Sequence, residues 1–117
     1  MTVSMPDTLN LNQEIERYRP GATEAGRRVE TLINAGGPRV VLVTMRSGIA
    51  LREHTAPGPI SIHGLRGRFR VTFEDQEREI GPGGIVSLAA SDRHAVETRE
   101  DGAFLLTIGA KPGARPA

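Results

Sequence analysis

Residues 60–73 read ISIHGLRGRFRVTF, and this stretch decides the fold class. In its second half the apolar residues Phe69, Val71 and Phe73 alternate with polar ones, and Ile60 and Ile62 alternate in the same way in the first half. Successive side chains of a strand point to opposite faces of a sheet, so this period of two predicts two half-buried strands. Residues 64–67 are expected to connect them.

The same kind of pattern continues on both sides of this stretch. Further strands are expected at residues 29–33, 39–45, 49–54, 85–89, 94–98 and 103–108, and a hairpin turn at residues 74–77 leads into a strand that ends at Ile80. The segments PGP at 57–59 and GPGG at 81–84 are breaks that no central strand could contain. About ten short strands without an internal repeat predict an all-β sandwich or barrel.

One short helix is expected before the strands. Asn10 can cap it, with Gln13 as its capping-box partner, and Leu11, Ile15 and Tyr18 then share one helical face. We expect this helix to pack against the sheet as a brace. The chain thus divides into a leader with a short helix (1–28), a β-barrel (29–110) and a flexible tail (111–117).

Length and composition narrow the class of protein. With 117 residues the chain can form one domain with its own core. It has no cysteine, which excludes disulfides, zinc ribbons and thiol nucleophiles. The net charge of +1 and the three Phe, one Tyr and no Trp give no basis for nucleic-acid binding. No segment is typical of a secretory signal or a membrane helix, so a soluble cytoplasmic protein without a membrane partner is expected.

The basic residues Arg66, Arg68 and Arg70 recur with a period of two. They could form an anion-binding surface. The interpretation we favour is a solvated strand face, paired with Glu77 and Glu79 on the returning strand.

Two segments resemble the two sequence motifs of the cupins. In the first, Gly48 is followed by five residues and His54, and the segment ends at Gly67. In the second, Gly83 leads to His94 at the spacing of the family motif, although Ala89 and Ser91 stand where the family has proline and glycine.

The resemblance covers residues 39–108 and extends to small single-domain bacterial cupins of the RmlC-like, cupin-2 type. It implies a double-stranded β-helix, which is the cupin jelly-roll barrel, with one short N-terminal helix. It also implies a homodimer. The strand at 29–33 is the expected contributor, because short strands in two sheets leave edges that must be covered.

The resemblance implies a ligand set that is only half present. Cupins that hold a metal usually do so with two histidines and a glutamate from the first motif and one histidine from the second. His54 and His94 match two of these positions, whereas Ala56 and Ile60 occupy the others and cannot coordinate. A catalytic site normally needs three protein ligands. His63 is the candidate third ligand, but strand alternation is expected to send it outward if Ile60 and Ile62 point inward.

Several functions therefore remain open. The leading hypothesis is a small-molecule-binding cupin of unassigned specificity, without a tightly held catalytic metal, whose pocket includes the four residues His54, His94, Ile60 and Ile62. A second is a metal-dependent enzyme, similar to a dioxygenase or isomerase, that acts on a small organic substrate and holds a divalent transition metal at His54 and His94, with either His63 or an unforeseen carboxylate as the third ligand. A third is a structural or interaction module. In the simplest alternative the two histidines are hydrogen-bonded to each other, to water or to backbone.

Overall fold

The protein is described here from a computed structural model. It describes residues 8–21, 25–34, 38–54, 58–90 and 92–109, and for residues 52–54 it describes the backbone alone. The predicted tail at 111–117 and Ala56 lie outside these ranges.

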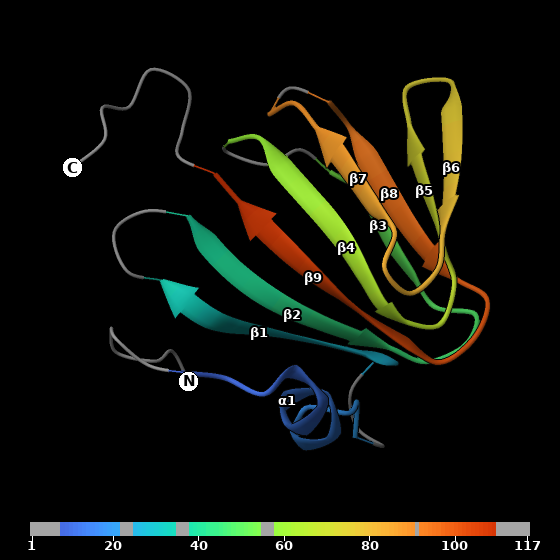
Figure 1. The fold of residues 1–117 in the computed structure, drawn as a ribbon. Coiled ribbons are helices and arrows are strands. Elements are labelled where there is room, and N and C mark those ends of the chain that lie inside the picture. The colour runs from blue at the N-terminus through green and yellow to red at the C-terminus, as the bar shows by residue number, and fades with distance from the viewer. Residues whose placement is uncertain (1–7, 22–24, 35–37, 55–57, 91, 110–117) are drawn as a thin grey trace.

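The described chain forms two antiparallel sheets and one helix (Figure 1). The elements in chain order are α1 (Leu11–Arg17), β1 (Arg27–Asn34), β2 (Arg39–Met45), β3 (Ala50–His54), β4 (Ile60–Arg66), β5 (Phe69–Phe73), β6 (Gln76–Ile80), β7 (Ile85–Leu88), β8 (His94–Thr98) and β9 (Gly102–Ile108). One sheet has the order β1-β2-β9-β4-β7, and the other has the order β3-β8-β5-β6. The predicted all-β fold with one short helix is confirmed.

The main core lies between the two sheets. Ile60 and Ile62 of β4 are 3% and 1% exposed and pack in the same cluster as Phe69 and Val71 of β5, both 0% exposed. The rings of Phe69 and Phe104 meet edge to face, with centroids 5.1 Å apart and an interplanar angle of 83°. The alternating apolar residues of 60–73 thus form the buried faces of two strands, as predicted, because they point toward the opposite sheet.

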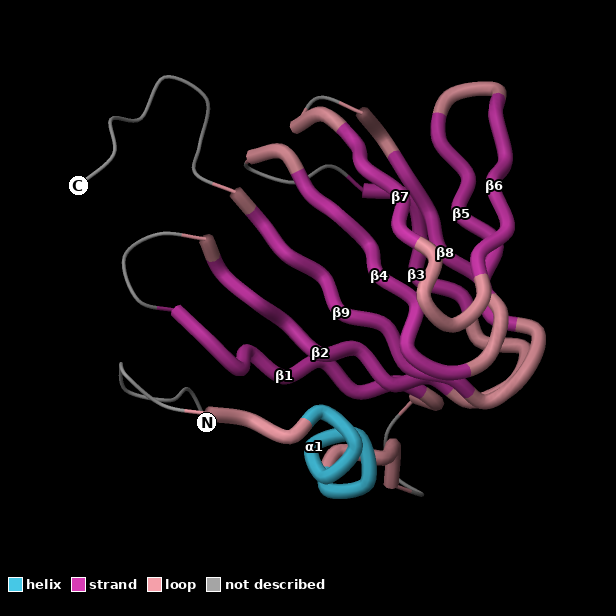
Figure 2. The backbone as a smooth tube through the Cα atoms, viewed as in Figure 1, coloured by secondary structure: helices cyan, strands magenta, loops and turns pink. Residues whose placement is uncertain are grey.

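Helix α1 covers part of the outer face of the five-stranded sheet (Figure 2). The Asn10 side chain accepts a hydrogen bond from the Gln13 amide at 3.1 Å, as a helix cap should. Ile15 packs in a second buried cluster with Leu32, Leu42 and Ala103 of the sheet. The predicted role of this helix as a brace is confirmed.

The described residues contain nine strands, in agreement with the expectation of about ten. Two other sequence-based expectations about the strands need correction. The hairpin turn is the pair Glu74-Asp75 alone, because Phe73 pairs with Gln76, which already belongs to β6. Arg66 does not share a strand with Arg68, since a turn at Gly67 separates β4 from β5.

The charged partners of the arginine stripe follow from this topology. Arg68 lies 3.5 Å from Glu79 and Arg70 is in register with Glu79, as expected for a solvated strand face. Arg66 instead pairs with Glu16 of α1 at 2.8 Å. Separately, no helix in the described ranges has the length and the hydropathy that a membrane crossing requires.

The glycines that carry the motif resemblance occupy turns with positive φ. The angle is +81° at Gly48, +76° at Gly67 and +87° at Gly83. L-residues with a side chain rarely adopt this conformation. At Gly67 a Cβ would also lie 2.7 Å from the carbonyl oxygen of Asp101, whereas at Gly48 it would meet open space. The Gly67 turn therefore demands glycine for two reasons and the Gly48 turn for one.

Gly48→Ala and Gly67→Ala separate these two causes. The first variant should lose about 1–2 kcal/mol of unfolding free energy from backbone strain alone. The second should lose about 2–5 kcal/mol, because overpacking against Asp101 adds to the same strain. Urea unfolding followed by circular dichroism measures both. Equal losses in the two variants would contradict the close approach at Gly67.

Candidate functional site

His94 is the buried histidine of the described sandwich. It is 2% exposed and begins β8, in which His94, Val96 and Thr98 are buried and the residues between them are not. Val96 belongs to the core cluster between the sheets. His94 shares its strand face and therefore points toward the same interior. In β5, Phe73 is its register partner.

A short loop before β8 orients the His94 ring. The Asp92 carboxylate accepts a hydrogen bond from the Ala89 amide at 2.9 Å, and the Asp92 amide donates to the Ala89 carbonyl at 3.1 Å. These two bonds fix the Asp92 backbone, whose carbonyl oxygen lies 3.2 Å from Nδ1 of His94. Asp92 thus contacts the imidazole through its backbone carbonyl, while its carboxylate holds the loop.

This contact determines the tautomer of a neutral His94. A carbonyl oxygen accepts hydrogen bonds and cannot donate them, so Nδ1 must carry the proton. The lone pair then resides on Nε2. Such a ring can accept a hydrogen bond from a ligand or coordinate a metal through Nε2.

His54 is placed by its backbone at the end of β3. It is the register partner of His94 across the β3–β8 ladder, after an irregularity between Leu51 and His54. Its side chain lies outside the described atoms, so its assignment to the pocket stays a prediction. The sequence separates these two histidines by 40 positions, and the ladder brings their backbones side by side.

The remaining predicted site residues lie on β4, on both of its faces. Ile60 and Ile62 are buried in the core between the sheets. His63 is half-buried and lies between Ile85 of β7 and Leu105 of β9 in the same sheet. By strand alternation it belongs to the outer face. The structure therefore separates His63 from the isoleucines of the predicted pocket.

The donor chemistry of the described side chains does not fit a three-ligand metal site. Position 60, where the resemblance would place a carboxylate, carries the hydrocarbon of a buried isoleucine. Among the described residues no group of three histidine, cysteine, aspartate or glutamate side chains could hold a metal ion. His94 is the member of the expected ligand set whose side chain is both described and buried in the core.

A cavity of about 340 Å³ lies outside the sandwich interior, between α1 and one end of the five-stranded sheet. Its wall combines apolar and charged residues, and His94 is not among them. The residues that line it are Ile15, Arg19, Pro20, Thr44, Met45, Arg46, Arg66, Asp101 and Gly102.

Sequence reasoning missed this cavity. Its three arginines come from the end of α1, the end of β2 and the end of β4, and nothing in the local sequence links them. The one available signal was Arg66, which the sequence pattern grouped with Arg68 and Arg70 on a single strand. The turn at Gly67 made that grouping wrong.

Comparisons with known proteins bear on the fold. No protein-family model matches the sequence, and no curated protein matches it. A conserved protein of unknown function from Streptococcus pyogenes has a TM-score of 0.74 at 21% identity, over 96% of this chain and 93% of that one. A cupin superfamily protein from Desulfitobacterium hafniense DCB-2 has a TM-score of 0.71 at 20% identity, over 79% of this chain and 84% of that one.

A third solved structure is described by its architecture. It is an RmlC-like cupin from Methanocaldococcus jannaschii with a double-stranded β-helix, and its TM-score is 0.68 at 16% identity, over 93% of this chain and 95% of that one. The two facing antiparallel sheets of the present chain define the same class of all-β protein. The chain has the cupin fold, as its two sequence motifs predict.

Proposed function

We propose that the chain is a cupin that binds a small molecule in the interior of its β-sandwich, without a tightly held catalytic metal. The observation that carries the proposal is the buried His94, whose Nδ1 contacts the Asp92 carbonyl and which shares a strand face with the core residue Val96. Binding pockets for small molecules are mostly apolar, with a few polar groups that orient the ligand. His94 supplies such a group.

The proposal includes His54 as a second polar group of this pocket. Its support is the backbone register, in which His54 and His94 are partners across β3 and β8. Directly opposed residues of an antiparallel ladder share one face of the sheet. Two imidazoles in one apolar pocket would recognise a molecule that carries hydroxyl, amide or carboxylate groups on a small hydrocarbon frame.

The apolar residues of β4 argue against a tightly bound metal in this pocket. Ile60 and Ile62 contribute hydrocarbon to the core, and His63 lies on the other face of the strand. A two-histidine set lacks the third protein ligand that zinc sites and non-haem iron sites use. We therefore propose that these side chains contact the ligand directly.

Metal analysis and ligand titration of the same protein preparation test this proposal. Protein purified without added metal should contain iron, manganese, nickel and zinc far below one equivalent. Phenol should shift amide NMR signals of the inner faces of β5 and β8, because its ring matches the apolar character of these faces and its hydroxyl can form a hydrogen bond with the His94 imidazole. His94→Ala should weaken this binding about tenfold, the cost of one hydrogen bond. His63→Ala is the matched control and should leave it unchanged.

Two outcomes would contradict the proposal. One equivalent of metal that is lost in His94→Ala would favour the metal-dependent enzyme, and its loss in His63→Ala as well would identify His63 as the third ligand. An absence of saturable shifts on the inner faces would favour the structural module. If His94→Ala fails to fold, His94→Gln serves instead, because it keeps a polar side chain of similar length.

We also propose that the chain forms a homodimer through β1. This strand is an edge of the five-stranded sheet, and its Val29 is 55% exposed. Unpaired strand edges are sites of pairing between chains. A second copy that extends the sheet at β1 would cover both the backbone and this valine.

Sedimentation velocity at micromolar concentration measures the dimer. The native chain should sediment as a dimer, and Val29→Lys should shift it toward the monomer, because a charge at the covered edge opposes pairing. Ile85→Lys, at an exposed position on the opposite edge strand β7, is the control and should remain dimeric. A native chain that sediments as a monomer would contradict the proposal.

A further inference from the structure

The cavity under α1 is distinct from the proposed pocket inside the sandwich. It lies between the helix and the ends of β2, β4 and β9, and the apolar residues of its lining include Ile15, which is 5% exposed, and Pro20. Its volume of about 340 Å³ is at the lower end of the range of small-molecule sites. It has room for a molecule of the size of a substituted benzene ring.

The charged part of the wall is dominated by arginine. Arg19, Arg46 and Arg66 line the cavity, and Asp101 is the acidic residue among its lining residues. The Asp101 carboxylate accepts a hydrogen bond from the Ser47 amide at 2.8 Å. Together with Glu16, which contacts two of the arginines, the acidic groups leave one positive charge uncompensated at the cavity.

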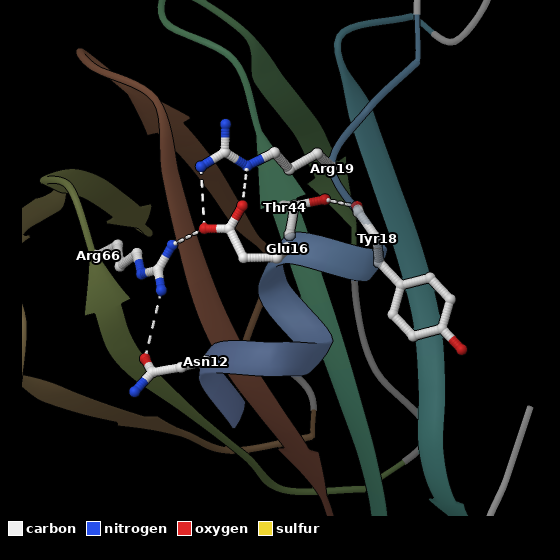
Figure 3. A network of polar contacts seen from close by, with 6 residues as sticks. All are labelled: Asn12, Glu16, Tyr18, Arg19, Thr44 and Arg66. Atoms are coloured by element: carbon white, nitrogen blue, oxygen red, sulfur yellow. Dashed lines mark hydrogen bonds and ion pairs between the residues drawn. The ribbon is translucent and has the colours of Figure 1, made fainter. Parts of the chain in front are cut away.

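Glu16 holds two of these arginines in place. Figure 3 shows its carboxylate between the guanidinium groups of Arg19 and Arg66, each 2.8 Å away. Arg66 also donates to the Asn12 side chain at 3.3 Å. The hydrogen bond from Arg66, followed by that from Arg19, keeps the pKa of Glu16 below its ordinary value. Glu16 therefore stays ionised at neutral pH and continues to orient both cations.

Arg46 is oriented by the backbone rather than by an acid. Its Nη2 donates to the Pro20 carbonyl at 2.7 Å, and its amide donates to the Gly26 carbonyl at 2.8 Å. Within the described ranges, no carboxylate forms an ion pair with its guanidinium. A guanidinium offers five N–H donors in a planar fork, so one bond to a carbonyl leaves capacity for an oxyanion.

We propose that this cavity is a second binding site, which takes a small organic carboxylate. The carboxylate would accept hydrogen bonds from Arg46 and Arg66, while the hydrocarbon part contacts Ile15 and Pro20. Arginine forks match the geometry of a carboxylate, and such charge-assisted pairs are stronger than neutral hydrogen bonds. The site lies on the other side of the five-stranded sheet from His94 and does not depend on the proposed function of the interior.

Occupation of this cavity would affect how α1 is held on the sheet. The Thr44 hydroxyl donates to the Tyr18 carbonyl at 2.6 Å (Figure 3). Arg46 contacts the Pro20 carbonyl, so these two bonds connect the segment after the helix to the end of β2 beside the cavity. A bound carboxylate would add contacts between α1 and the sheet.

An NMR titration with benzoate at low ionic strength tests the proposal. Saturable shifts are expected for amides of residues 44–46 and 101–102, with no comparable shifts in β3 and β8. Benzyl alcohol, which has the same ring without the charge, should not bind. Arg46→Gln should weaken benzoate binding about tenfold or more, as the loss of a charge-assisted hydrogen bond predicts. Arg46→Lys should weaken it less, because the charge remains without the fork.

Arg39→Gln is the matched control. Arg39 is an exposed arginine at the start of β2, whereas Arg46 directly follows the end of that strand, so the loss of Arg39 changes the net charge equally and should leave benzoate affinity within about twofold. Equal benzoate affinity in Arg46→Gln and the native chain would overturn the proposal. So would binding of benzyl alcohol as tight as that of benzoate, or an absence of shifts at the cavity up to about 10 mM benzoate. None of these outcomes bears on the phenol titration of the interior.

Discussion

The burial of one face of each central strand against the opposite sheet is the constraint on which the rest of the structure depends. Phe69 and Phe104 meet at the centre of this contact, one from each sheet, and both are almost fully buried. Because side chains alternate along a strand, a register shift of one residue would move every apolar side chain to the wrong face. The same alternation that buries Val96 also turns His94 into the core.

The outer face of the five-stranded sheet, which α1 covers, is stabilised by a different combination of interactions. Ile15 covers Leu42 and Ala103 by apolar packing, and Glu16 beside it forms exposed ion pairs with Arg19 and Arg66. Exposed ion pairs contribute little stability, so apolar burial holds α1 on the sheet. The ion pairs instead determine where the arginine side chains point, and this gives the adjoining cavity its charge.

The sequence predicted the fold because its signals are local. Alternation identified β4 and β5, Asn10 marked the helix start, and the motif glycines Gly48 and Gly67 marked turns that need positive φ. The alternation along β4 also predicted that His63 lies on the face opposite to Ile62.

Features that depend on distant residues were less predictable. The bond from Nδ1 of His94 to the Asp92 backbone arises from a loop whose geometry no residue pattern specifies. The arginine-lined cavity needs three strand and helix ends to meet, and the pairing of Arg66 with Glu16 joins residues 50 positions apart. The regular spacing of Arg66, Arg68 and Arg70 was also misleading, because the turn at Gly67 places Arg66 on a different strand from the other two.

The central claim is that the two rings of His54 and His94 share the interior of the sandwich. Long-range proton–nitrogen NMR spectra of the histidine rings, combined with proton–proton nuclear Overhauser effects, test it most directly. The account predicts that His94 is protonated at Nδ1 and that its ring protons show contacts to those of His54 and to core methyl groups. A His94 protonated at Nε2, or a His54 ring without contacts to His94 and the core, would contradict it.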